Sequence, residues 1–183
     1  MDEIQEKKLI RQALEGNDLA FRDLIEAYYK TIERFARQIG VQEDDLADVT
    51  QEVFIKVYRF LSKYSRGKFS TWLYSITLNV SKDLFKKQKR ESEKRKKFSE
   101  LPSIESYVEN HFLSENEQLL HNTIQQMEDK YRIPIVLFYF HDQSINEIAA
   151  ITKTKEATIK THLKRGKERL KEALKEGGYI DEG

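Results

Sequence analysis

The sequence predicts an all-α protein built from two small helical domains joined by a linker. Apolar residues recur with the 3.6-residue period of amphipathic helices along most of the chain. Only 7 Gly and 2 Pro occur in 183 residues, too few turn-forming residues for an all-β fold. With 39% hydrophobic and 34% charged residues, two small cores fit the composition better than one thick core.

The first predicted helices follow from this periodicity. Residues 3–39 are expected to be helical, with Asn17 as an N-cap inside the stretch and Gly40 as its stop. A second helix is predicted from Glu43 to Leu61, and the polar sequence Ser62–Lys68 is predicted to be a loop.

A third helix is predicted after this loop, with Ser70 as its cap, and it runs into the basic sequence KKQKR. These helices form a predicted first domain over residues 1–90. Residues 91–117 have weak periodicity and many polar side chains, so we expect a linker there, with a short helical turn near residues 104–112.

The second predicted domain covers residues 118–178. Its first helix is expected over Glu117–Lys130, and Pro134 is expected in the first turn of the next helix. Ser144-Ile-Asn-Glu147 has the pattern of a capping box that starts a short helix. After a tight turn, a long helix is predicted over Glu156–Lys175.

Charge is distributed in blocks, although the formal net charge is only +1. Residues 64–99 hold 11 basic and 3 acidic side chains, residues 100–143 hold 2 and 8, and residues 144–183 hold 9 and 7. Clustered Lys and Arg attract polyanions and neutralise phosphates. One such run is readily explained as a solvated face, but two runs beside helical motifs favour a polyanionic ligand.

Residue content excludes several classes of protein. The chain has no Cys, which rules out a disulfide scaffold, a thiolate metal site and a Cys nucleophile. Its four His show no metal-ligand spacing, and no Gly-rich phosphate loop occurs, so we expect no enzyme, no metal and no cofactor. No apolar run approaches about 18 residues and the first residues are no signal peptide, so we expect a cytoplasmic chain without membrane insertion.

A helix-turn-helix is predicted at about residues 144–170, from a short helix, a tight turn and a second helix with cations outside its apolar stripe. Such a helix fits the major groove, where its first turns meet base edges and flanking cations meet phosphates. The candidate DNA-contacting residues are Glu156, Thr158, Lys160, Thr161, Lys164 and Arg165. Taken alone, the motif also fits an ordinary helical hairpin with a charged outer face.

Two further surfaces are predicted in the first domain. Carboxylates at every fourth position form an acidic stripe along one helix: Asp44, Asp48 and Glu52. This stripe is either a solvated face or a docking face for a basic partner. The next helix presents Thr71, Ser75 and Asn79 as candidate nucleotide contacts, and Asn79 suits an adenine edge or a flipped base. Tyr64 is the better candidate for base stacking, because Trp72 has the helical spacing of a core residue.

Three segments also carry a family resemblance. They are Asp45-Leu-Ala-Asp-Val-Thr-Gln-Glu-Val-Phe-Ile-Lys-Val-Tyr58, then Lys68-Phe-Ser-Thr-Trp-Leu-Tyr-Ser-Ile-Thr-Leu-Asn79, then Ser144-Ile-Asn-Glu-Ile-Ala-Ala-Ile151 with Ala157-Thr-Ile-Lys160 and Arg165. In this order they resemble the extracytoplasmic-function (ECF) group of bacterial sigma factors, in the sigma-70 family. The resemblance covers residues 9–90 as the second sigma region and residues 118–176 as the fourth.

The resemblance implies a role for each surface. The acidic helix would bind core RNA polymerase through Asp45, Asp48, Gln51, Glu52 and Phe54. The loop 61–68 would capture a flipped base of the −10 element, and the basic helix would hold the phosphates of promoter DNA. The implied −10 residues are Tyr64, Lys68, Asn79, Lys82, Lys86, Lys87, Lys89 and Arg90. The helix-turn-helix would read the −35 element as duplex, and an anti-sigma factor would hold the protein inactive.

Five positions depart from the family pattern, and two of them, Thr154 and Lys155, stand where the family has a hydrophobic residue and a Ser. Ser75 replaces the usual Arg, which weakens any −10 contact from that position, and Lys153 replaces the usual Gly of the turn. Thr154 is then expected to cap the recognition helix. Gly166 replaces the usual Ala, at an expected cost of up to about 1 kcal/mol.

A stand-alone helix-turn-helix regulator is the alternative function. It accounts for the C-terminal motif but leaves segments 45–58 and 69–79 without a role. Such a regulator binds duplex DNA by itself, whereas a sigma factor requires core polymerase.

Overall fold

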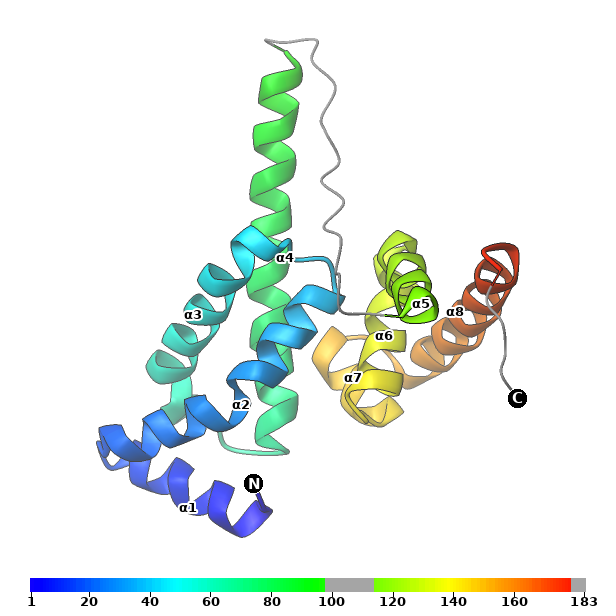
Figure 1. Ribbon diagram of the computed structural model, residues 1–183. Coiled ribbons are helices and arrows are strands. Elements are labelled where there is room, and N and C mark those ends of the chain that lie inside the picture. Colours follow the sequence, from blue (N-terminus) through cyan, green and yellow to red (C-terminus); the bar gives the residue numbers. More distant parts are fainter. Residues whose placement is uncertain (98–113, 179–183) are drawn as a thin grey trace.

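The computed structural model describes residues 1–97 and 114–178, and every regular element within them is helical (Figure 1). In chain order the elements are α1 (Glu3–Leu14), α2 (Asp18–Gln38), α3 (Glu43–Phe60), the 3₁₀ helix η1 (Leu61–Lys63), α4 (Phe69–Lys96), α5 (Glu115–Gln126), α6 (Asp129–Phe140), α7 (Ile145–Thr152) and α8 (Glu156–Glu176). The predicted all-α class is confirmed. We call α1–α4 the N-terminal unit and α5–α8 the C-terminal unit.

In the N-terminal unit, α2, α3 and α4 pack against one another and α1 packs on α2. The helical stretch predicted over residues 3–39 divides where Gly16 adopts φ +89 and Asn17 caps α2. The Asn17 side-chain oxygen accepts hydrogen bonds from the backbone N–H groups of Leu19 and Ala20, at 3.1 and 3.2 Å. This cap confirms the role predicted for Asn17.

Helix α4 differs from the prediction at both ends. It begins at Phe69 with Lys68 in the N-cap position and no capping hydrogen bond, so the predicted Ser70 cap is wrong. It continues to Lys96, so the first residues of the expected linker are helical; they are mostly Lys, Arg and Glu, which favour helix. Its C-terminal half projects beyond the other helices (Figure 1). The helical turn expected near residues 104–112 lies outside the described residues.

The C-terminal unit is organised around α6, which packs against α7 and α8 and is buried along most of its length. The helix predicted over residues 117–130 is wrong at its end, because the backbone is extended at Met127 and Glu128 and α6 starts at Asp129. Pro134 therefore lies in the interior of α6, beyond the first turn where we expected it. Apolar residues keep their helical spacing across this break, so the sequence does not indicate that one helix ends and another begins there.

The helix-turn-helix has the predicted start, the predicted position of its turn and the predicted long helix from Glu156, but a different cap on that helix. Ser144 and Glu147 form the capping box, since each side chain accepts from the other residue's backbone N–H, at 3.2 and 2.8 Å. Lys153 ends α7 in the left-handed conformation, with φ 53 and ψ 43. The predicted Thr154 cap is wrong: Lys155 occupies the N-cap position of α8, and the Thr154 hydroxyl donates to the Thr152 carbonyl at 3.2 Å.

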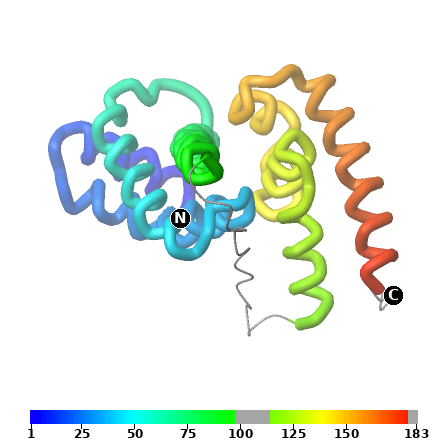
Figure 2. The backbone as a smooth tube through the Cα atoms, turned by 90° about the horizontal axis from the view of Figure 1, so that it is seen from above, coloured from blue at the N-terminus to red at the C-terminus, as the bar shows by residue number. Residues whose placement is uncertain are grey.

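The two units lie side by side, with α4 of the N-terminal unit against α7 of the C-terminal unit (Figure 2). The end of α2 also meets α5. Among the helices of the described residues, none is both long enough and apolar enough to cross a membrane.

Candidate nucleic-acid and partner interfaces

An acidic face lies on the outer side of α3. Asp48, Gln51 and Glu52 are exposed and share this side of the helix, and we call these three residues the acidic face. Asp45, which the sequence placed with them, is only half-exposed because its carboxylate accepts a hydrogen bond from the Gln88 side chain at 2.9 Å. That bond ties the beginning of α3 to the basic part of α4.

The acidic face continues into apolar residues that the sequence interpretation missed. Ile55 and Tyr58 follow at helical spacing and are 45% and 62% exposed, which is unusual for such large apolar side chains. The Tyr58 ring contacts the Phe21 ring edge-on, with centroids 5.1 Å apart. Phe54, predicted as a contact residue, is only 7% exposed and stacks on Tyr29, so it supports this surface from beneath. The sequence does contain a signal for this surface, because the helical spacing of the acidic residues continues to the apolar residues Ile55 and Tyr58.

The loop before α4 is built around an aromatic cluster. The Tyr64 ring lies 5.3 Å from the Phe69 ring and 5.4 Å from the Trp72 ring, measured between centroids. The Tyr64 hydroxyl donates to the Gly67 carbonyl at 2.7 Å, and burial raises the pKa of this hydroxyl. Gly67 has φ +83, which a residue with a side chain rarely adopts. Tyr64 is half-buried, so this loop holds it in place while leaving part of it accessible.

The predicted −10 residues are distributed along the whole of α4. Asn79 and five cations are exposed, and these cations are Lys82, Lys86, Lys87, Lys89 and Arg90. With a rise of about 1.5 Å per residue, roughly 33 Å of helix separates Lys68 from Arg90. The structure therefore does not gather these residues in one pocket; it arranges them along a rod that leads away from the loop.

Lys68 is engaged by the other unit. Its ammonium lies 2.7 Å from the carboxylate of Glu147 in α7, and this hydrogen bond raises the pKa of Lys68. Burial raises the pKa of Glu147, but hydrogen bonds from Lys68 and Ser144 outweigh burial, so the net pKa is below its ordinary value. Both groups are therefore charged at neutral pH.

The recognition helix α8 has one packed side and one exposed side. Ile159 and Leu163 are buried, while the predicted DNA-contacting residues Lys160, Thr161, Lys164 and Arg165 are exposed. The exposed positions recur at the spacing of a single helix face, so the structure brings these four together.

The beginning of α8 differs from its middle. Glu156 accepts a hydrogen bond from the Asn146 side chain of α7 at 2.9 Å, and Thr158 is half-buried. The turn adds two exposed cations, Lys153 and Lys155, that were not assigned to the DNA surface from the sequence. Cations next to a recognition helix are placed to meet phosphates.

Within the described part of the chain, no three or more His, Asp or Glu side chains lie together as metal ligands. What the described residues do form is an acidic and apolar surface on α3, a basic helix α4 and a cationic helix-turn-helix face. Two helical units with these surfaces define a two-module DNA-binding protein.

Two family models match this architecture: Sigma-70 region 2 over residues 24–91, and Sigma-70, region 4 over residues 117–170. The chain belongs to the sigma-70 family of transcription initiation factors, in its ECF group. The resemblance found in the sequence is confirmed. Proteins of this family are regulatory rather than catalytic.

Relatives extend over nearly the whole chain. The ECF RNA polymerase sigma factor SigW of Bacillus subtilis (strain 168) is 32% identical over 185 residues, covering 95% of this chain and 99% of SigW. The ECF RNA polymerase sigma-E factor of Escherichia coli (strain K12) is 30% identical, covering 92% of this chain and 94% of that protein.

Solved structures share the fold. CnrH, in complex with the cytosolic domain of CnrY, matches with a TM-score of 0.70 and 23% identity over 93% of this chain and 97% of CnrH. The sigma factor RpoE of Bartonella quintana, in complex with the anti-sigma factor NepR, matches with a TM-score of 0.70 and 20% identity over 85% of this chain and 96% of RpoE.

Proposed function

We propose that this protein binds core RNA polymerase and directs it to promoters that carry a −10 and a −35 element. The observation that carries this proposal is the pairing, in one chain, of an exposed acidic and apolar surface on α3 with a cationic helix-turn-helix face on α8. The first surface suits a basic protein partner and the second suits duplex DNA. In this role the chain is a non-catalytic subunit that acts in the cytoplasm, together with the polymerase.

The polymerase contact rests on the acidic face with Ile55 and Tyr58. Charge complementarity steers association, while exposed apolar and aromatic side chains supply most of the affinity once they are buried. Asp45 and Phe54 then act by holding α3 in position, Asp45 through Gln88 and Phe54 through the core.

The −10 contact rests on the Tyr64 loop and α4. Unstacking a base costs a few kcal/mol, which an aromatic platform and hydrogen bonds to the exposed base repay. Tyr64 and Asn79 suit those two tasks, and the cations from Lys82 to Arg90 suit the phosphates of the same strand. We assign this work to a domain of residues 1–90.

The −35 contact rests on α8. Lys160, Thr161, Lys164 and Arg165 face outward together and reach the major groove when α8 lies in it. We assign this contact to a domain of residues 118–178, linked through residues 91–117. Mounting both domains on one polymerase raises the effective concentration of each at its own element.

An anti-sigma factor is the proposed regulator. The solved structures of CnrH and of RpoE each hold a partner, CnrY and the anti-sigma factor NepR, respectively. We propose that a protein of this kind covers the surfaces described above, and affinity capture from cells grown under several stresses tests it. Recovery of polymerase as the sole partner in all conditions contradicts it.

Run-off transcription with purified core polymerase tests the main proposal. We expect initiation at discrete start sites in genomic templates only when this chain is added, and no specific shift of duplex DNA by the chain alone. Tight, specific binding of duplex DNA without polymerase, together with failure to direct initiation, would instead establish the stand-alone regulator.

A further inference from the structure

The recognition helix α8 begins with a carboxylate that is fixed to the helix before it. Glu156, the first residue of α8, accepts a hydrogen bond at its Oε1 atom from the side-chain amide of Asn146 in α7, at 2.9 Å. Both side chains are exposed. Asn146 is the second residue of α7, so the bond joins the first turns of the two helices of the helix-turn-helix. The other carboxylate oxygen, Oε2, has no hydrogen-bond partner among the described residues.

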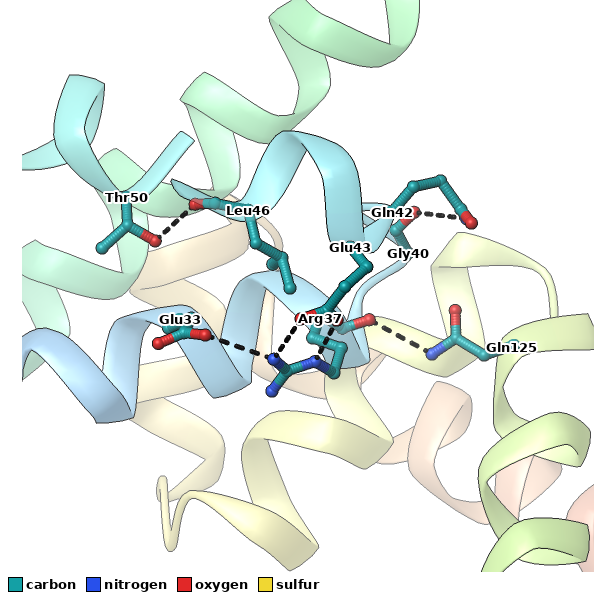
Figure 3. Close-up of polar contacts among 8 residues, drawn as sticks. All are labelled: Glu33, Arg37, Gly40, Gln42, Glu43, Leu46, Thr50 and Gln125. Atoms are coloured by element: carbon teal, nitrogen blue, oxygen red, sulfur yellow. Dashed lines mark hydrogen bonds and ion pairs between the residues drawn. The ribbon is translucent and has the colours of Figure 1, made fainter. Parts of the chain in front are cut away.

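Glu156 differs from other carboxylates of this chain in how it is paired. A Glu four residues before a Lys or Arg is well placed to form an ion pair along a helix. Glu33 and Arg37 form such a pair in α2, at 3.2 Å, and Glu43 adds a second carboxylate to the same guanidinium (Figure 3). Lys160 stands four residues after Glu156, yet these two residues form no ion pair in the described part of the chain. The carboxylate is turned toward α7 instead, and the Lys160 ammonium remains available for another partner.

This carboxylate stands among the cations that we propose to meet DNA. The exposed cations around it are Lys153 and Lys155 in the turn, and Lys160 and Lys164 on the same side of α8. A negative charge in this place opposes the attraction to phosphates, so it weakens binding to DNA of arbitrary sequence. An acidic residue in the first turn is also stabilised by the helix dipole, but that effect requires no bond to Asn146.

A carboxylate is selective in the major groove because it only accepts hydrogen bonds. Guanine presents two acceptors there, and thymine presents an acceptor and a methyl group, so neither base can donate to it. Adenine offers an amino donor beside an acceptor, whereas cytosine offers the amino donor N4 with no acceptor of its own next to it. Cytosine is therefore the base that the Oε2 atom of Glu156 fits best. The first turns of a recognition helix are also the part that meets base edges.

We propose that Glu156 accepts a hydrogen bond from the N4 amino group of a cytosine in the −35 element, and that Asn146 is the positioning residue that aims its carboxylate. Lys160, one turn further along α8, suits the guanine paired with that cytosine, since Lys donates to the O6 and N7 atoms of guanine. The carboxylate also discriminates against other bases, because a charge left unpaired in the interface is costly. This inference rests on the function proposed above and specifies one base of the −35 contact.

The exposure of the bond between Asn146 and Glu156 separates this role from a purely structural one. Water readily replaces an exposed hydrogen bond, so this bond adds little to the free energy of unfolding. Without it the Glu156 side chain is free to change rotamer, and a carboxylate held less firmly discriminates less well between bases. Asn146→Ala should therefore reduce base selectivity and leave the urea midpoint of unfolding nearly unchanged.

The test uses the full chain bound to core polymerase, on a promoter at which it directs initiation. A template library carries every single base change across the −35 element, and sequencing of the run-off transcripts gives the relative initiation from each template. Glu156→Gln removes the charge and adds a donor, and Asn146→Ala removes the positioning bond. Glu172→Gln is the matched control, because it makes the same change at an exposed carboxylate of α8, about 24 Å further along the helix.

We expect one −35 position at which the parent and Glu172→Gln initiate about tenfold more often with cytosine than with any other base. Glu156→Gln should lose this preference and keep those at the other positions, and Asn146→Ala should reduce it about fivefold. A cytosine preference that survives in Glu156→Gln, or a lost preference for another base, overturns the assignment to cytosine, and full selectivity in Asn146→Ala overturns the positioning role. Absence of initiation by the parent would overturn the proposed function as well, whereas initiation without a base preference that depends on Glu156 overturns this inference alone.

Discussion

Gly166 of α8 lies so close to α6 that an added Cβ atom would stand 3.1 Å from the Cγ1 atom of Ile135. The same Cβ would stand 3.3 Å from the Cβ atom of Tyr131. Ile135 is fully buried, and a Cβ atom moves only with its backbone, so neither neighbour yields easily. The glycine that the sequence predicts to weaken α8 therefore lies at a close contact between α8 and α6.

Gly166→Ala should therefore destabilise the protein although alanine favours helix. Relief of the glycine penalty is worth up to about 1 kcal/mol, whereas forcing a methyl group into a filled core costs about 1–3 kcal/mol. We expect a net loss of about 1 kcal/mol in the free energy of unfolding, measured with urea. Lys167→Ala, at the exposed neighbouring position, is the control and should be nearly neutral. A more stable Gly166→Ala protein would show that α6 can yield.

Lys153→Gly should stabilise the helix-turn-helix. Lys153 adopts φ 53, where a side chain costs about 1 kcal/mol and glycine does not. We expect a gain of about 0.5–1 kcal/mol in the free energy of unfolding. Lys155→Gly removes the same charge at an extended position and should give no gain, so equal effects of the two changes would contradict this explanation.

Stability should fall in acid through His141. Burial, followed by the charge of Arg34, lowers the pKa of His141 from 6.5 to about 4, while Tyr74 and Gln38 bind its neutral form. Between these pH values the unfolded chain binds more protons, so the free energy of unfolding decreases as the pH falls from 6.5 to 4 and is unaffected by this group above 6.5.

Urea unfolding at a series of pH values measures this dependence. His141→Gln keeps a polar side chain but does not titrate, so its profile should be flatter over the same interval. His121, whose pKa burial also lowers, is present in both proteins and cancels in the comparison. Parallel profiles for the two proteins would exclude His141 as the source.

Tyr58→Ala should weaken polymerase binding without unfolding the chain. Tyr58 is 62% exposed, so little core packing is lost, yet a central aromatic contact typically accounts for tenfold or more in affinity. Asp48→Lys should act in the same direction, more strongly at low salt. Glu26→Lys, an equivalent charge change on the exposed side of α2, is the control. Titration of labelled core polymerase measures all three, and equal losses would mean that α3 has no special role.

Replacing both Lys164 and Arg165 by Ala should abolish −35-dependent transcription and leave core binding intact. Both side chains are exposed on α8, where loss of a base or phosphate contact costs about 1–3 kcal/mol each. Run-off transcription and core titration on the same preparation separate the two effects. A parallel loss of core binding would show that α8 faces the polymerase.

The positions of the helices could be predicted from local sequence patterns, whereas the breaks between helices and several of the helix caps could not. Asn17 and the Ser144–Glu147 capping box were identified because each uses neighbouring residues only. The break at Met127 was missed because the apolar period runs straight across it, and the interior Pro134 looked like a helix start. Such features depend on where the next helix must pack, which no window of sequence contains.

Only some features of the candidate site could likewise be predicted from the sequence. The exposed cations of α8 and the acidic face of α3 were recognisable because charge recurs with the helical period. The burial of Phe54, the exposure of Tyr58 and the pairing of Lys68 with Glu147 were not, since each depends on residues far away in the chain. The contact between Tyr74 and His141 joins positions 67 residues apart, and neither residue carries a local signal for it.

Because α4 is one uninterrupted helix, the distance between its loop end and its downstream cations is fixed by helix geometry. Its 28 residues span about 42 Å, close to the length of 12 base pairs of B-form duplex. Inserting one residue after Asn79 would turn every downstream cation by about 100° around the helix axis, away from the strand that we propose these cations contact. If α4 holds the −10 strand as proposed, the register of this single helix sets the offset between a captured base and the phosphates bound by the cations.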